Sequence, residues 1–346
     1  MLYWGVGWCP AAIGCNASVR TQPPILGLLI AVGLLSVGSL ADADPKLYEG
    51  RTLDDWIGDL RLFSDATPAS RERAIASIGR IGKPAGAPLL RKVSKLHALG
   101  CARALARIGE PAIPALIQAL TEGDDLMRIQ RAAEALGEMG PAAKASVWAL
   151  GRTTQHDDMW IRIASLDALG QIGPGALGVA PAIRSCLYDP WVRVPISAAE
   201  ALWRVTGEIK LPVDTLLRSL RDVDESIRDT ALQALGRIGP TPRVIRILIR
   251  TLNDVAEPPR RTARQVLAEY GDVALPALLE ALGGRGRTQA TRAGAALVVA
   301  KLGSKAAPAV PALQDLFDRR QPPPVRDAAA YALGEIGAAA APAVPA

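Results

Sequence analysis

Apolar residues recur along the chain at a helical spacing. In several segments they occupy positions i, i+3, i+4 and i+7, as in Ile113, Leu116, Ile117 and Leu120. The same spacing returns in residues 213–220 and 275–282. It places the apolar side chains on one face of an α-helix, which needs a partner to cover it.

A second helical pattern alternates with the first and contains the phrase A-L-G-x-I-G. In its clearest copy the inward stripe is Ile227, Ala231, Ala234, Leu235 and Ile238. The apolar residue before the first small position defines an anchor, found at Ile78, Leu105, Leu136, Leu169, Leu202, Leu235, Leu267, Val299 and Leu333. Successive anchors lie 27 to 34 residues apart. This period predicts an all-α fold, a right-handed α-solenoid of about nine two-helix repeats.

Glycine marks two positions of the repeat. The phrase ends in Gly, often followed by Pro as in Gly140-Pro141, which predicts a left-handed helix stop. Glycine also follows the anchor directly in five repeats, which predicts close approach of neighbouring helices: Gly79, Gly137, Gly170, Gly236 and Gly334. Trp203 interrupts this rule, either as an aromatic side chain filling a wider gap or as a ligand-stacking residue.

The N-terminal region has the pattern of an export signal. Residues 25–40 form an uncharged apolar run, preceded by Arg20 and followed by the A-x-A sequence of residues 41–43. The run is shorter than the roughly 18 to 20 residues that span a bilayer comfortably. We therefore expect residues 1–43 to be an extension and signal peptide cleaved after Ala43, or a signal anchor if cleavage fails. Either outcome exports the remainder to the periplasm or the extracellular space.

Three further segments follow the signal. Residues 44–69 are expected to form an N-terminal capping helix and turn, in which Thr52 caps with Asp55 and Leu53, Trp56 and Leu60 face inward. Residues 70–337 form the repeat array. Residues 338–346 are apolar, and they begin an incomplete tenth repeat or form a frayed tail.

Composition supports a helical core and argues against catalysis. The chain is 49% hydrophobic but only 4% aromatic, and its net charge of +6 weakly favours anionic partners. Cys101 and Cys186 lie more than two repeats apart, so they are expected to be buried thiols that do not pair with each other. The two histidines, His97 and His156, form no metal-binding pair, and no phosphate-binding loop is present. We predict no enzyme, no cofactor and no metal.

The phrase also carries a family resemblance. Val-Arg or Ile-Arg followed by A-x-x-A-L-G-x-I-G, in residues 161–173, 227–239 and 325–337, resembles HEAT-like repeats of the phycobilisome lyase type. Residues 48–56 resemble the opening motif of exported bacterial proteins of this kind. The resemblance covers residues 71–337. It implies that an arginine seven residues before the anchor pairs with an aspartate of the inter-helix turn, and this position is occupied by Arg71, Arg162, Arg228, Arg260, Arg292 and Arg326.

These observations favour a non-enzymatic scaffold that binds a protein or peptide outside the cytoplasm. Two alternatives stay open, nucleic-acid or other polyanion binding through basic helix ridges and a lyase-like subunit related to bilin lyases. Nucleic acid is disfavoured because the position two after the anchor mixes acidic and basic residues. A membrane contact is expected only through an uncleaved 25–40 segment. The expected partner surface comprises Trp203, Arg243, Arg246 and Arg250.

Overall fold

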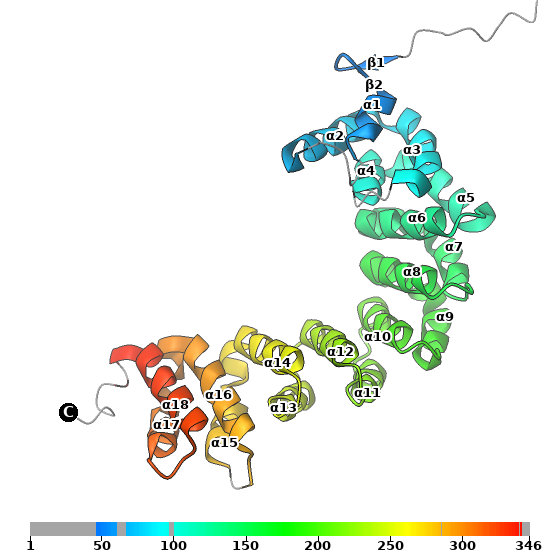
Figure 1. The fold of residues 1–346 in the computed structure, drawn as a ribbon. Coiled ribbons are helices and arrows are strands. Elements are labelled where there is room, and N and C mark those ends of the chain that lie inside the picture. The colour runs from blue at the N-terminus through cyan, green and yellow to red at the C-terminus, as the bar shows by residue number, and fades with distance from the viewer. Residues whose placement is uncertain (1–45, 61–66, 97–99, 285, 339, 341–346) are drawn as a thin grey trace, which may run out of the picture. The chain divides into compact units, whose positions relative to one another are not determined.

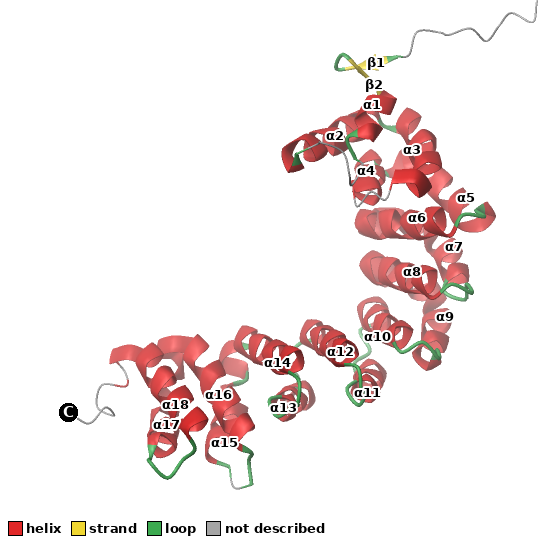
Figure 2. Cartoon of the chain, in the orientation of Figure 1, coloured by secondary structure: helices red, strands yellow, loops and turns green. Residues whose placement is uncertain are grey.

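The computed structural model describes residues 46–60, 67–96, 100–284, 286–338 and 340. This part of the chain is helical except for one short antiparallel hairpin, β1 (Leu47–Tyr48) and β2 (Arg51–Thr52) (Figure 2). The predicted signal segment, His97 and the last six residues lie outside the described residues, so the expectations for them are not tested by the fold.

The helices alternate between two layers. One layer holds the first helix of every pair: α1 (Leu53–Gly58), α3 (Lys83–Leu96), α5 (Ile113–Glu122), α7 (Val147–Thr153), α9 (Ala180–Ser185), α11 (Lys210–Ser219), α13 (Pro242–Thr251), α15 (Leu275–Gly283) and α17 (Val310–Phe317). The other layer holds the second helix of every pair: α2 (Pro68–Ile81), α4 (Gly100–Ile108), α6 (Leu126–Met139), α8 (Met159–Ile172), α10 (Arg193–Thr206), α12 (Glu225–Ile238), α14 (Glu257–Glu269), α16 (Gln289–Leu302) and α18 (Pro323–Ile336).

The second helices pack on one another in an unbroken series from α2 to α18 (Figure 1). Each contains one predicted anchor, and every anchor is at most 7% exposed. The predicted stripe of α12 is also buried, from Ile227 to Ile238. Because neither helix of a pair can bury its apolar face alone, contact between successive pairs supplies the core. The predicted all-α solenoid is confirmed.

Glycine after the anchor permits the close packing of second helices. A Cβ atom placed on Gly137 would lie 3.0 Å from the Ala168 Cα atom of the next second helix. One on Gly170 would lie 3.2 Å from the Ala201 Cα atom. Gly334, in the last repeat, would meet nothing within 4 Å. The requirement for glycine therefore comes from the neighbouring repeat and not from the helix itself.

The glycines that end the second helices have positive φ, but most are not in the left-handed helical region that the sequence led us to expect. Gly173 has φ 71° and ψ −139°, and Gly140 has φ 58° and ψ −134°. At these two glycines a 3-10 turn begins at the same residue. Gly207, with φ 74° and ψ 1°, is left-handed. The 3-10 turns are η1 (Glu110–Ala112), η2 (Gly140–Ser146), η3 (Gly173–Val179), η4 (Cys186–Tyr188), η5 (Gly271–Val273) and η6 (Gly303–Ala309).

The N-terminal cap contains the predicted capping box together with a hairpin that the sequence did not suggest. The Thr52 side chain accepts from the Asp55 backbone N–H, and the Asp55 carboxylate accepts from the Thr52 N–H. The Trp56 indole N–H donates to the Tyr48 carbonyl at 3.0 Å, which ties the hairpin to α1. Strands of two residues are too short to leave a period-2 pattern, so only the tertiary contact reveals them.

Two cysteines and one long apolar segment pack into the repeat stack. Cys101 and Cys186 are buried free thiols, as predicted. Residues Gln289–Phe317 are long and apolar enough to cross a membrane by length and composition alone. They comprise α16, η6 and α17, and they pack against α18 as part of the repeat stack.

Candidate partner-binding surface

In the second-helix layer, a hollow of about 340 Å³ lies over α6 and α8. Helices α4, α6 and α8 pack in succession there, and α6 and α8 meet where Gly137 contacts Ala168. The hollow is lined mainly by side chains of these three helices, among them Arg103, Gln130, Arg131, Glu134, Glu138, Trp160, Ile163, Asp167 and Gln171.

The α8 wall of the hollow combines apolar and acidic groups. Trp160, Ile163 and Asp167 occupy positions i, i+3 and i+7, which lie on one helix face. Trp160 stands in the first turn, where the Asp158 carboxylate caps the helix by accepting from the Trp160 N–H at 2.8 Å. The Trp160 side chain is 47% exposed although it is one of the largest apolar groups in the protein.

The basic residues of the hollow are neutralised by neighbours. Arg103 pairs with Glu72 of α2 at 2.7 Å. Arg131 pairs with Glu134 one turn further along α6. Glu138 and Asp167 have no ion pair with any described residue. The charge left over in the hollow is therefore acidic.

Asp167 has an unusual electrostatic environment. Its side chain is exposed at the surface, but it stands between packed helices that reduce the hydration of the carboxylate. This burial is the main reason that the pKa of Asp167 rises to about 6. Glu200 raises the pKa further, while a hydrogen bond with Ser197 and the charges of Arg204 and Arg237 lower it. Glu200 itself forms ion pairs with both arginines at 2.6 Å. Much of their positive charge is therefore neutralised before it can act on Asp167.

The structure separates the residues that the sequence suggested for the partner surface. Trp203 lies on α10 in the second-helix layer and is partly buried against the core. Arg243, Arg246 and Arg250 lie on α13 in the first-helix layer. The Arg243 guanidinium forms an ion pair with Asp214 of α11. Arg246 and Arg250 are exposed, and no described residue forms an ion pair with either.

Sequence reasoning missed Trp160 and Asp167. The signal was present, because α8 carries apolar residues on the face opposite its anchor as well as beside it. Read by itself, that pattern also fits a helix buried on all sides. Only the position of α6 decides that this face borders open space.

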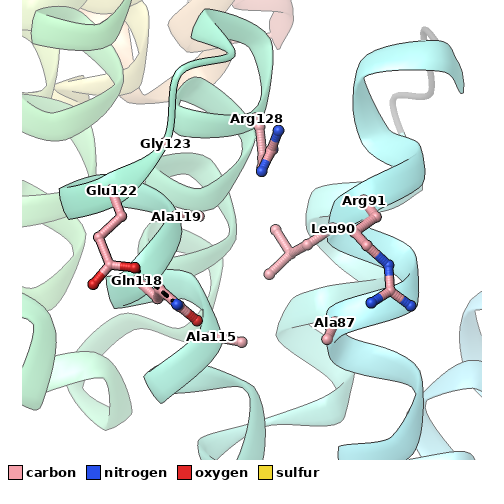
Figure 3. A pocket seen from close by; sticks show the side chains of 9 residues that line it. All are labelled: Ala87, Leu90, Arg91, Ala115, Gln118, Ala119, Glu122, Gly123 and Arg128. Carbon is pink, nitrogen blue, oxygen red and sulfur yellow. Dashed lines mark hydrogen bonds between the residues drawn. The ribbon is translucent and has the colours of Figure 1, made fainter. Parts of the chain in front are cut away.

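A second hollow, of about 270 Å³, lies between α3 and α5 in the first-helix layer (Figure 3). Leu90 and Ala87 of α3 face Ala115 and Ala119 of α5 across it. Arg128 stands one residue before the position, seven residues ahead of the anchor, that carries an arginine in six of the repeats. Its Nε atom is buried without a hydrogen-bond partner among the described residues.

Two of the six arginines at the position seven before the anchor form the ion pair that the resemblance implies. Arg162 and Arg228 are each only 8% exposed and each reaches an aspartate in the next inter-helix turn. Arg162 donates to Asp189 at 3.0 Å and to the His156 carbonyl at 2.8 Å. Further along, Arg260 donates to its own turn and to Glu257, and Arg292 lies 3.5 Å from the Gly284 carbonyl. The remaining two, Arg71 on α2 and Arg326 on α18, are half-buried.

Metal-ligand clusters, histidine and cysteine are the remaining candidates for chemistry. No group of three or more His, Cys, Asp and Glu side chains among them is placed to hold a metal ion. His156 accepts a hydrogen bond from the Asp158 N–H at 3.0 Å within a turn. Burial raises the pKa of the Cys101 thiol to about 12, so at neutral pH it is protonated and is a poor nucleophile.

Stacked helix pairs, joined at two repeat boundaries by Arg162 and Arg228, define an α-solenoid scaffold. Comparison with known families matches HEAT repeats over residues 60–137, 113–203, 180–268 and 258–334. A PBS lyase HEAT-like repeat matches over residues 325–345. The chain belongs to the HEAT repeat family. No curated protein sequence matches the chain.

Two Kap proteins of known structure show the same fold. Yeast importin beta, Kap95p, is 13% identical with a TM-score of 0.51, over 88% of this chain and 46% of that one. Kap121p bound to Ste12p is 13% identical with a TM-score of 0.51, over 84% and 41%. The CpcE and CpcF complex of phycocyanin lyase from Nostoc sp. is 25% identical with a TM-score of 0.42, over 70% and 96%. The chain thus spans less than half the length of the two Kap proteins.

Proposed function

We propose that this protein is a non-enzymatic scaffold that binds a protein or peptide outside the cytoplasm, and that the hollow over α6 and α8 is part of its binding surface. The exposed ring of Trp160 carries the proposal. Large aromatic side chains that stand open to water beside polar groups are typical anchors of protein interfaces. Leaving such a ring exposed loses the free energy that its burial would release, and a bound partner recovers it.

The fold is suited to this role. Stacked repeats present long continuous surfaces, and each repeat adds contact area without changing its neighbours. Kap121p, which has a similar fold, has been solved with a bound protein, Ste12p. We infer that this chain also uses the fold to bind a protein.

The non-enzymatic part of the proposal rests on the described side chains. They offer buried thiols and a histidine engaged within a turn, and neither type of group is placed for nucleophilic or acid–base chemistry. A lyase-like role is tested by adding a bilin to the purified full chain. A change in bilin absorbance with stable attachment would overturn this part of the proposal.

The compartment rests on the sequence of residues 1–43 and needs its own test. We would express the full chain with a C-terminal tag in a bacterial host and identify the mature N-terminus by mass spectrometry. An envelope product beginning at Asp44 is the expected result. A full-length product in the cytosolic fraction would contradict export while leaving the binding surface unaffected.

The surface is tested by crosslinking from a single position. A photo-reactive benzoylphenylalanine replaces Gln171, which is exposed and lines the hollow, or Arg152, which is exposed on α7 in the other layer. We expect the same discrete protein to be captured from Gln171 in repeated envelope preparations, and not from Arg152. The Trp160→Ala variant should abolish the capture. Equal capture from both positions would contradict the assignment.

A polyanion remains the second candidate partner, because Arg246 and Arg250 present unpaired charge on α13. The pairing of Arg243 with Asp214 weakens this ridge and places it second. Binding of duplex DNA at physiological salt, lost on Arg246→Gln and Arg250→Gln and falling steeply with added salt, would favour it.

A further inference from the structure

The hollow over α6 and α8 has a charge opposite to that of the chain as a whole. The protein carries a net charge of +6. Within the hollow, however, both arginines are paired with glutamates, so Glu138 and Asp167 set the local sign. A cationic group is therefore the complementary occupant, and a phosphate is repelled.

Glu138 and Asp167 line the same hollow from two neighbouring helices. Gly137 of α6 and Ala168 of α8 meet so closely that a Cβ on Gly137 would lie 3.0 Å from the Ala168 Cα atom. Glu138 follows Gly137 in sequence and Asp167 precedes Ala168, so the two acids flank this contact point on facing helices. A cationic group that enters the hollow therefore meets acidic side chains from both helices.

The hollow extends from the acids to an apolar position. Trp160 lies seven residues before Asp167 on α8, which is about 10 Å along the helix axis. Ile163 lies between them and is partly buried against the core. In an extended peptide, about 10 Å corresponds to three residues. A ligand that fills the hollow therefore needs an apolar group and a cation at that separation.

We propose that the hollow binds an extended segment of the partner protein in which a lysine or arginine meets Asp167 and Glu138 and an apolar residue three positions away packs on Trp160. This inference rests on the proposed function, since it names the chemistry of the partner. The direction in which the bound peptide runs is not fixed, because both ends of the hollow are defined by side chains alone. A simple amine is too short to use both positions, which is why a peptide is the occupant.

The test begins with an unbiased selection. The full chain, held through a C-terminal tag, selects binders from a phage-displayed library of random dodecapeptides. We expect enrichment of peptides with an apolar residue and a basic residue three positions apart. A representative peptide is then synthesised with its basic residue either retained or replaced by Gln, and both forms are titrated by fluorescence anisotropy.

Matched variants assign the contact. Asp167→Asn and Glu138→Gln keep the side-chain shape and remove one charge each, and each should weaken the basic peptide by about five- to tenfold. The Gln peptide should bind the wild type more weakly and should be insensitive to both substitutions. Asp157→Asn removes an exposed acid from the turn before α8, and it serves as the control that leaves affinity unchanged.

The outcomes separate this inference from the proposed function. Peptides that lose binding on Trp160→Ala but lack a basic residue would overturn the inference and leave the binding surface in place. Failure to select any peptide that depends on Trp160 or Asp167 would overturn both the inference and the assignment of the hollow. Circular dichroism spectra identical to that of the wild type ensure that each loss reflects the contact and not unfolding.

Discussion

Arg228 and Asp254 form a two-bond ion pair across a repeat boundary. The Arg228 Nη2 and Nε atoms lie 2.8 and 2.9 Å from the two Asp254 carboxylate oxygens. The Nη1 atom of the same guanidinium donates to the carbonyl oxygens of Asp222 and Val223 at 2.8 and 3.1 Å. One side chain thus closes its own inter-helix turn and attaches it to the next turn.

Replacing Arg228 by Met should destabilise the protein by about 2 to 4 kcal/mol, because Asp254 and two carbonyl groups lose their partner in a partly buried site. The measurement is urea unfolding followed by circular dichroism. Arg246→Met is the control, since Arg246 is exposed and forms no ion pair with a described residue, and it should stay within about 0.5 kcal/mol of the wild type. A similar loss in both variants would contradict the structural role of Arg228.

The same pair predicts a pH dependence. Burial raises the pKa of Asp254, but hydrogen bonds from Arg228 and from the Ala256 N–H outweigh burial and lower it. A lowered pKa means that the ion pair stabilises the fold above the ordinary aspartate range and is lost as pH falls through the lowered value. The difference between wild type and Arg228→Met should therefore shrink when unfolding is repeated in strong acid. A constant difference would show that packing and not charge carries the effect.

Two glycine substitutions should have opposite signs. Gly137→Ala places a methyl group 3.0 Å from the Ala168 backbone and should destabilise by about 1 to 3 kcal/mol. Gly334→Ala adds a methyl group with nothing within 4 Å. It should stabilise by up to about 1 kcal/mol, because alanine is the better helix former. Thermal denaturation of both variants checks the prediction, and equal signs would refute the close-packing explanation.

Binding in the hollow should weaken in mild acid. Because the pKa of Asp167 lies at about 6, its carboxylate loses its charge as pH falls from 7 to 5. Affinity for the basic peptide should fall over that interval in the wild type but not in Asp167→Asn. A wild-type affinity independent of pH would contradict a charged contact with Asp167. The charged neighbours that act on this titration or line the same hollow are Glu200, Arg204, Arg237, Arg103, Arg131, Glu134 and Glu138.

The raised pKa of Asp167 also affects stability. A carboxyl group whose folded pKa exceeds its unfolded value favours folding when protonated, so its ionisation destabilises the fold as pH rises from about 4 to above 6. Asp167→Asn should therefore be slightly more stable than the wild type at pH 8 and equal to it below pH 4. Since the side chain reaches solvent, the gain should be small, about 1 kcal/mol or less. Unfolding curves at the two pH values provide the comparison.

The buried thiols should be unreactive in the native protein. Burial raises the pKa of both Cys101 and Cys186. We expect neither to react with iodoacetamide at pH 8 in the folded chain, and both to react in concentrated urea. Peptide mapping by mass spectrometry distinguishes these two positions from other cysteines. Rapid native labelling of Cys186 would show that the α9 region opens.

Much of the architecture was predictable because its signals are local and periodic. Each second helix carries an apolar stripe around an anchor such as Leu169, and the stripe follows from the helical period alone. Glycine at a helix end marks a backbone that needs positive φ, and glycine after an anchor marks a close neighbour. Repetition of these signals at a regular interval identifies the solenoid without any knowledge of contacts.

The sequence by itself determined the helices, the repeat period and the register of buried positions in this protein. The tertiary structure alone decided which exposed positions matter. Trp203 and Trp160 are alike as isolated tryptophans in second helices, but Trp203 packs partly against the core while Trp160 borders a hollow. The physical reason is that the helical period places every anchor on the inward face of its helix, whichever repeat it belongs to. A hollow exists only between helices, so its shape and charge depend on how α6 and α8 are brought together.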